Sequence, residues 1–234
     1  MSRLAIFFLM VVAPALSICL ALLGLETLRG NLLGWFLLVL GIAYPAGGVI
    51  YYFIRHEPFW KSAGGGEAAR EESGDRSFWL ILPGFLVVFF AAPLEWIYLP
   101  SLMPRSAWLA LSRIEGMQIA GLTLLLSAVA LRVWTRAHLR GQYSGHVEVQ
   151  AGHRLVQSGP YRFVRHPGYT GFLLLTLGMV IGYSSLIGLA AVPVLLLPGL
   201  AYRMKVEERL LTEQFGEDYR TYVRKSKKLI PGIW

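Results

Sequence analysis

The chain has 234 residues, a formal charge of +8 and only 15% charged residues, and its mean hydropathy is +0.53. Soluble domains carry about a quarter charged residues, so this composition argues against a soluble domain. The lone cysteine, Cys19, excludes an intrachain disulfide and a metal cluster built on thiols.

Several apolar stretches are long enough to cross a bilayer, which takes about 20 helical residues. Four of them are Leu4–Leu28, Leu32–Ile54, Phe78–Leu99 and Gly116–Trp134. A fifth, Tyr169–Tyr202, is interrupted by Gly182-Tyr183-Ser184-Ser185, which predicts two short helices folded into a hairpin. We therefore predict an all-α, polytopic membrane bundle with about six transmembrane segments, a helical hairpin at 169–202 and a cytoplasmic C-terminal helix.

The first stretch resembles a signal peptide, but its apolar core is too long and it lacks a small-residue cleavage site, so we interpret it as a true span. With both termini cytoplasmic, 19 of the 22 Lys and Arg residues lie on the cytoplasmic side. Because positive charge marks that side, this is the predicted topology. The location would be the plasma (inner) membrane of a bacterium or the endoplasmic reticulum of a eukaryote. The basic excess is thus a topology signal and does not predict nucleic-acid binding.

The chain divides into two predicted parts. Residues 1–115 hold N-terminal helices and a flexible cytoplasmic linker at 55–77, and residues 116–234 hold the polar motifs. Within the spans, Glu95 and Glu26 are interpreted as interfacial and solvated. We find no G-x-G-x-x-G, Walker A or H-E-x-x-H pattern.

The loop before the hairpin ends in Gly159-Pro160-Tyr161-Arg162-Phe163-Val164-Arg165-His166-Pro167-Gly168-Tyr169. Proline favours the first turn of a helix, so a helix is predicted to begin at or just after Pro167. Its free N–H groups would attract an anion such as the carboxylate of an amino-acid-like cofactor. Alternatively, Arg162, Arg165 and His166 only anchor the helix at the lipid headgroups.

Beyond the hairpin, Arg203 and Glu207 stand four residues apart, which places them on one helix face. They are either an ordinary surface pair or the partners of the His166 loop, beside which the topology places them. Gly216 is predicted to end the helix. Tyr219 and Tyr222 would then supply packing.

Taken together, the motifs resemble the isoprenylcysteine carboxyl methyltransferase family, part of a wider group of membrane methyltransferases that includes phospholipid methyltransferases. The matching motifs are H-x-L-V, G-P-Y-R, R-H-P-x-Y-x-G, R-x-x-x-E-E-x-x-L and F-G-x-x-Y-x-x-Y, within Arg132–Trp234. The resemblance implies S-adenosyl-L-methionine as cofactor. It implies cofactor contacts from His153, Arg154, Leu155, Val156, Tyr161, His166, Pro167, Gly168, Tyr169 and Glu207.

The resemblance also implies that Arg203 binds the methyl acceptor, and we take Arg203 and Glu208 as candidate catalytic residues. The expected acceptor is the carboxylate of an isoprenylated cysteine or a similar lipophilic molecule, reached through membrane lipid. A carboxylate nucleophile needs no general base. A small thiol or phospholipid amine is the alternative acceptor and would give His166 or Glu208 a role as base. Outside the enzymes, the alternative interpretation is a non-catalytic membrane scaffold or a transporter. No metal is expected.

Overall fold

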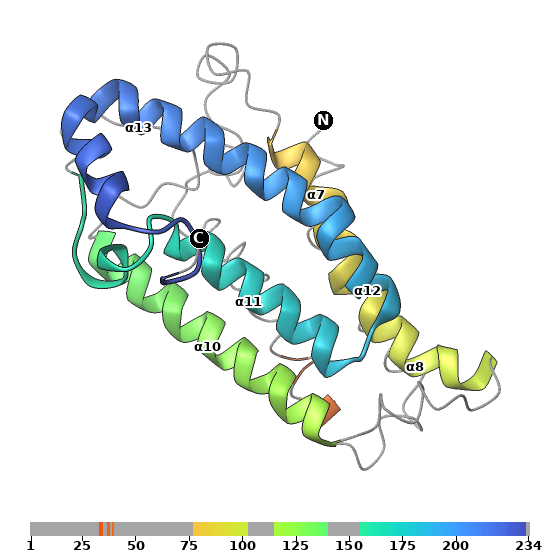
Figure 1. The fold of residues 1–234 in the computed structure, drawn as a ribbon. Helices are drawn as coiled ribbons and strands as arrows, with labels where there is room; N and C mark the ends of the chain where they lie inside the picture. The colour runs from red at the N-terminus through yellow and green to blue at the C-terminus, as the bar shows by residue number, and fades with distance from the viewer. Residues whose placement is uncertain are drawn as a thin grey trace, which may run out of the picture.

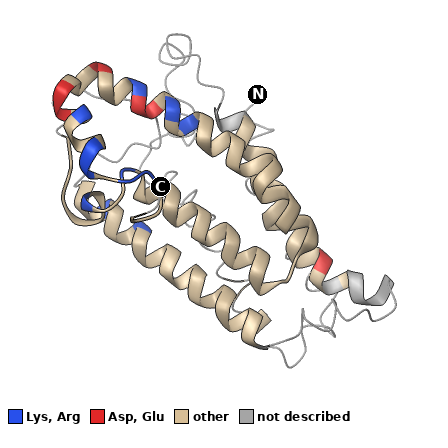
Figure 2. Cartoon of the chain, in the orientation of Figure 1, with Lys and Arg blue, Asp and Glu red and all other residues tan. Residues whose placement is uncertain are grey.

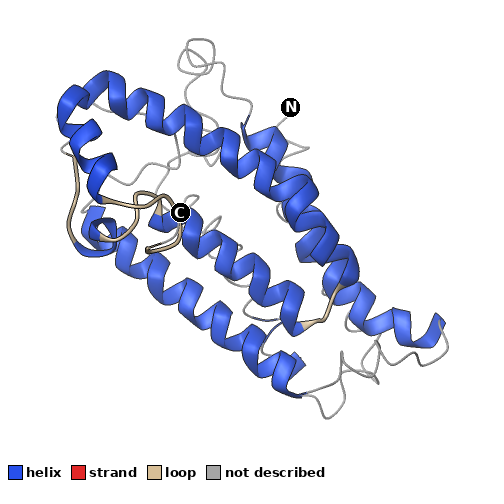
Figure 3. Cartoon of the chain, viewed as in Figure 1, coloured by secondary structure: helices blue, strands red, loops and turns tan. Residues whose placement is uncertain are grey.

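The computed structural model describes residues 33–34, 37, 39, 77–102, 115–139 and 155–232. Apart from one bridge pair, all regular structure in these ranges is helical (Figure 3), which confirms the predicted all-α class for this part of the chain. The span Leu4–Leu28, most of Leu32–Ile54 and the linker up to residue 76 lie outside the described residues. Glu26 and Cys19 lie outside them too.

The helices run in alternating directions, except that α7, η2 and α8 (Ser77–Leu102) continue one another, as do α12, η4 and α13 (Leu186–Lys225) (Figure 1). In chain order they are α7 (Ser77–Leu86), the π-helical η2 (Val87–Ala91), α8 (Ala92–Leu102), α10 (Glu115–Leu139), the 3₁₀ turn η3 (Gly159–Arg162), α11 (Pro167–Gly182), α12 (Leu186–Ala191), the π-helical η4 (Val192–Leu196) and α13 (Leu197–Lys225).

The predicted hairpin is present, with a correction to its second arm. Its first arm, α11, begins at Pro167 and ends at Gly182, as expected from the sequence. The second arm is not short, because the helix runs from Leu186 past Tyr202 to a kink at Gly216 and then on to Lys225. Pro193 is absorbed in the π-helical turn η4 and does not end the helix. The predicted C-terminal helix is therefore a continuation of the second arm.

The two arms of the hairpin pack against different neighbours (Figure 1). The first arm, α11, packs along α10, while α13 packs along α7. Close backbone approach is possible at both contacts because glycines face the neighbouring helix. A Cβ on Gly121 would lie 2.5 Å from the Cα of Gly182, and one on Gly199 would lie 2.9 Å from the backbone nitrogen of Ile81.

Glu95 joins the turn of the hairpin to α8. Its carboxylate accepts hydrogen bonds from Ser185 Oγ at 2.6 Å and from the amides of Leu186 and Ile187 at 3.0 and 3.2 Å. These amides belong to the first turn of α12, where a negative charge is favourable. Glu95, which the sequence placed at the interface as a solvated charge, is half-buried and in addition caps a helix.

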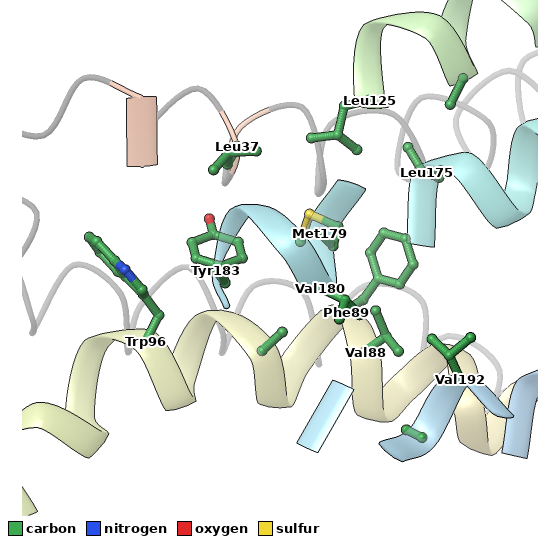
Figure 4. Close-up of a cluster of buried hydrophobic side chains, with 13 residues drawn as sticks. Leu37, Val88, Phe89, Trp96, Leu125, Leu175, Met179, Val180, Tyr183 and Val192 are labelled. Carbon is green, nitrogen blue, oxygen red and sulfur yellow. The ribbon is translucent and has the colours of Figure 1, made fainter. Parts of the chain in front are cut away.

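The apolar core lies where α7–α8, α10, α11 and α12 meet (Figure 4). Leu125 of α10, Met179 of α11 and Val88 of η2 are fully enclosed there. Tyr183, at the hairpin turn, packs against Trp96 with ring centroids 5.8 Å apart and donates a hydrogen bond to the carbonyl of Gly34. This core fixes the hairpin turn, and the arms extend from it.

Large apolar side chains also cover the outside of the helices. On α10, Ile119, Leu126 and Val133 recur every seventh residue and are 53%, 53% and 59% exposed. Two described helices, Gly116–Leu139 and Leu186–Lys225, are long and apolar enough to cross a membrane. Two shorter apolar helices are Leu80–Trp96 and Pro167–Gly182. An exposed apolar stripe of this length fits lipid better than water.

Replacing Gly121 by Val should separate α10 from α11, because the new side chain would overlap the backbone of Gly178 and Gly182. We expect a loss of at least about 1–3 kcal/mol in stability. Thermal unfolding of the detergent-solubilised protein measures it. Ala120→Val is the matched control, since Ala120 is exposed on the same helix. Equal melting temperatures for the two variants would contradict the close contact.

Candidate functional site

The loop leading to α11 is tightly folded from Leu155 onward. Gly159 adopts φ +59°, and a Cβ there would lie 2.3 Å from the His138 ring at the end of α10. Glycine is therefore required for both the backbone conformation and the contact. Tyr161 follows in η3, and its carbonyl accepts a 2.6 Å hydrogen bond from the Tyr222 hydroxyl. The loop is thus held against both α10 and the last turns of α13.

His166, the residue before α11, lies between two glutamates of α13. The His166 side chain is almost fully buried, with Nδ1 3.6 Å from Glu207 Oε2 and Nε2 3.4 Å from Glu208 Oε1. Its ring also lies against Tyr169, at 5.6 Å between centroids. The histidine therefore connects the start of α11 to α13, although 41 residues separate His166 from Glu207.

Tyr169, in the first turn of α11, makes the second connection to α13. Its hydroxyl accepts a 2.8 Å hydrogen bond from Arg203 Nε. Tyr169 also hydrogen bonds to Glu207. Arg203 and Glu207, which the sequence placed on one helix face, thus meet the same tyrosine.

Glu208 holds three cationic groups at once. Its Oε1 lies 3.1 Å from Arg165 Nε and 3.4 Å from His166 Nε2, while Oε2 lies 3.0 Å from Lys228 Nζ. The Arg165 side chain is only 7% exposed and also donates to the carbonyls of Val223 and Ser226. Headgroup anchoring is therefore the wrong interpretation for Arg165, because its guanidinium is enclosed by protein.

The electrostatics follow from these contacts. Burial alone would lower the pKa of His166, but Glu207 and Glu208 outweigh it and raise that pKa to about 9. Burial alone would raise the pKa of Glu208, but hydrogen bonds from His166 and Lys228 and their charges lower it to about 2. The pKa of Glu207 is likewise lowered, against its burial, mainly by His166. At neutral pH the imidazole is a cation between two carboxylates.

A kink in α13 completes the site. Gly216, at φ 51° and ψ −121°, interrupts the helix as predicted, although the helix resumes at once in a new direction. The turns after the kink come back toward α11 (Figure 1), and Tyr219 and Tyr222 are buried there. Most charged residues of the described helices gather at this end, as Figure 2 shows.

The structure brings together most of the residues that the sequence singled out. His166, Tyr169, Arg203, Glu207 and Glu208 form one cluster. Pro167 begins α11, and a Cβ on Gly168 would meet no atom of the described residues within 4 Å, so these residues leave space beside the first turn. Leu155 and Val156 are half-buried at the start of the loop. His153 and Arg154 lie outside the described residues.

Three further residues of the site were not assigned to it from the sequence. Arg165 and Lys228 both bind Glu208, and the hydroxyl of Tyr219 is enclosed without a hydrogen-bond partner among the described residues. The run of basic residues after Gly216 could have indicated that a cation from this segment reaches the site. The same run is also expected on the cytoplasmic side of a membrane protein, and it does not distinguish one lysine from another. In the described ranges no three His, Cys, Asp or Glu side chains are grouped as metal ligands.

The elevated pKa of His166 predicts that the protein loses stability in alkaline solution. The folded-state pKa, about 9, lies above the ordinary value of 6.5. The stabilisation is therefore complete below pH 6.5 and is lost as the pH rises through 9, at a cost of about 1–3 kcal/mol. Melting temperatures measured from pH 6 to 10 test this. A His166→Gln variant should lack this alkaline loss, and an identical loss in the variant would contradict the assignment.

Comparisons with known proteins agree with the motifs. A model of the isoprenylcysteine carboxyl methyltransferase family matches residues 121–213. A probable protein-S-isoprenylcysteine O-methyltransferase of Oryza sativa subsp. indica is 34% identical over 35% of this chain and 42% of its own length. Protein-S-isoprenylcysteine O-methyltransferase B of Arabidopsis thaliana is 30% identical over 48% of this chain and 58% of its own.

The Saccharomyces cerevisiae protein-S-isoprenylcysteine O-methyltransferase is 31% identical over 45% of this chain and 46% of its own length. The chain thus spans about half the length of the curated relatives it matches. The matched residues contain α11, Arg203, Glu207 and Glu208. The resemblance that the motifs indicated is therefore confirmed: residues 121–213 of the chain are similar to the isoprenylcysteine carboxyl methyltransferase family.

Proposed function

We propose that this protein is an integral membrane methyltransferase that uses S-adenosyl-L-methionine to methylate the carboxylate of an isoprenylated cysteine or a similar lipophilic acceptor. One observation carries the proposal. The His166–Tyr169 segment and the Arg203–Glu208 segment, which hold the family motifs, meet through direct side-chain contacts at the end of apolar helices.

The residues present fit this cofactor. Its amino-acid portion carries an ammonium group, and the cluster offers the carboxylate of Glu207, which the buried His166 holds in place. The Glu207 side chain is 31% exposed and thus reachable from outside. The described residues leave room beside Gly168 at the first turn of α11. The enclosed hydroxyl of Tyr219 lies in the electrostatic field of Glu208 and Arg165 and has no hydrogen-bond partner in the described part of the chain, whereas buried hydroxyls normally have one.

When bound, the cofactor supplies a methyl group already activated on a sulfonium sulfur. The protein then has to hold the acceptor in line and exclude water, which in ideal cases contributes about 7–11 kcal/mol. Arg203 would hold the acceptor carboxylate as a fork, and its bond to Tyr169 fixes the guanidinium plane. Arg203 lies one helical turn nearer the apolar part of α13 than Glu207, where a lipid-borne group would arrive.

A carboxylate nucleophile needs no proton removed, and this agrees with the electrostatics of Glu208. A carboxylate with a pKa of about 2 and three cationic partners is a poor base at neutral pH. We therefore give Glu208 a positioning role in place of the catalytic role considered from the sequence. A thiol or amine acceptor would require a base, for which the protonated His166 is also unsuited.

The membrane arrangement is part of the proposal. About six segments with both termini cytoplasmic account for the distribution of Lys and Arg, and the alternating directions of α7–α8, α10, α11 and α12–α13 agree with such an arrangement. The division at residue 115 stays a prediction. The packing of α7 along α13 indicates that the N-terminal part supports the site.

Purified protein should bind S-adenosylhomocysteine, the demethylated product, with micromolar affinity or better, about −8 kcal/mol. Glu207→Gln should weaken binding at least tenfold, because it removes the charge that faces the cofactor, and calorimetry measures this. Glu213→Gln is the matched control, since Glu213 is exposed on the same helix. Equal affinities for the two variants would exclude Glu207 as a contact.

Arg203→Ala should abolish methyl transfer while leaving affinity for S-adenosylhomocysteine within a few-fold. Arg203→Lys should rescue poorly, because an ammonium cannot reproduce a bidentate fork.

Shortening the prenyl chain of a prenylcysteine substrate should lower turnover sharply, since about 0.8 kcal/mol is at stake for each buried CH₂. Transfer to small thiols alone, with none to a prenylcysteine, would overturn the acceptor assignment and favour the small-thiol alternative.

A further inference from the structure

The residues after α13 form a strap across the start of α11, and we define this strap as Ser226–Ile230. It pairs with the loop as a short parallel bridge between Val164 and Lys227. Arg165 N donates to the carbonyl of Lys227 at 2.7 Å, and His166 N donates to that of Lys228 at 3.1 Å. The backbone of the histidine between the two glutamates is therefore fixed by the strap.

Side chains fasten the strap at both ends. Thr170 Oγ1, in the first turn of α11, donates a 2.8 Å hydrogen bond to the carbonyl of Leu229. Leu229 itself is 1% exposed. At the other end Arg165 donates to the carbonyl of Ser226 at 2.6 Å. The strap is thus docked over the site and is not a loose extension of α13.

Two neighbouring lysines of the strap have different surroundings. Lys227 is exposed, whereas the side chain of Lys228 is 27% exposed and reaches Glu208 Oε2 at 3.0 Å. The same glutamate contacts Arg165 and His166 through its other oxygen. Lys228 therefore fixes the carboxylate that in turn orients the imidazole.

We propose that Lys228 is a positioning residue of the cofactor site and that docking of the strap, through Lys228 and Glu208, sets the orientation of His166. The inference rests on the proposed function, because it assigns His166 to cofactor binding. Without Lys228, Glu208 Oε2 loses this cationic partner, and the carboxylate is held only through Oε1, by Arg165 and His166. The orientation of His166 is then less tightly fixed. The site would then bind the cofactor less well although the helices remain packed.

The test compares Lys228→Met with Lys227→Met, which makes the same chemical change at the exposed neighbour. Calorimetry with S-adenosylhomocysteine should show about tenfold weaker binding for Lys228→Met and unchanged binding for Lys227→Met. Lys228→Arg should restore affinity to within about threefold, because it keeps the positive charge. Equal binding by the two methionine variants would overturn the proposal. So would a loss of affinity that Lys228→Arg fails to restore.

A second measurement needs no cofactor, so it separates this inference from the proposed function. Hydrogen–deuterium exchange of the purified protein reports the amides of Arg165 and His166, which donate to the strap. In Lys228→Met these amides should exchange faster than in Lys227→Met, while peptides from α10 stay equally protected. If the wild-type protein binds no S-adenosylhomocysteine but the two variants differ in exchange in this way, the proposed function fails and the strap's coupling to His166 stands. Unchanged exchange at Arg165 and His166 would refute the coupling.

Discussion

The imidazole of His166 depends on two carboxylates that it also holds in place, and this mutual dependence decides how the site is built. A buried imidazolium is unfavourable unless charge neutralises it, and Glu207 and Glu208 supply that charge from α13. The two carboxylates would repel each other without His166, Arg165 and Lys228 around them. The start of α11 and the outer part of α13 can therefore come together only as a set of paired charges.

The rest of the fold positions the start of α11 and the outer part of α13 for this contact. Along most of their length the arms of the hairpin pack on different helices, α11 on α10 and α13 on α7. Glu95 caps α12 at the turn and fixes one end of the hairpin, while the charged cluster closes the other. Close packing at Gly121 and Gly199 sets the distances between the helices that carry the two halves. Packing along the helices thus stabilises the fold, and polar contacts at the helix ends determine how the ends are placed relative to one another.

Much of this was predictable from the sequence, and the rest was not for identifiable reasons. Apolar length and Pro167 gave the hairpin and the start of α11, and four-residue spacing put Arg203 beside Glu207. The continuation of the second arm into the C-terminal helix was missed because apolar residues give way to charged ones at Tyr202, and this change marks the end of an apolar stretch without ending the helix. Arg165, Glu95 and Lys228 were misjudged or overlooked since a charged side chain near a membrane has the same local sequence whether it faces water or a buried partner.

The central claim is that the His166 segment and the Arg203–Glu208 segment form one cofactor site. Hydrogen–deuterium exchange with and without S-adenosylhomocysteine tests it most directly, because each segment gives its own peptides. Bound ligand should slow exchange in residues 163–170 and 203–210 together, over the same range of ligand concentration. Protection of one segment without the other, or of neither at saturating ligand, would contradict the account.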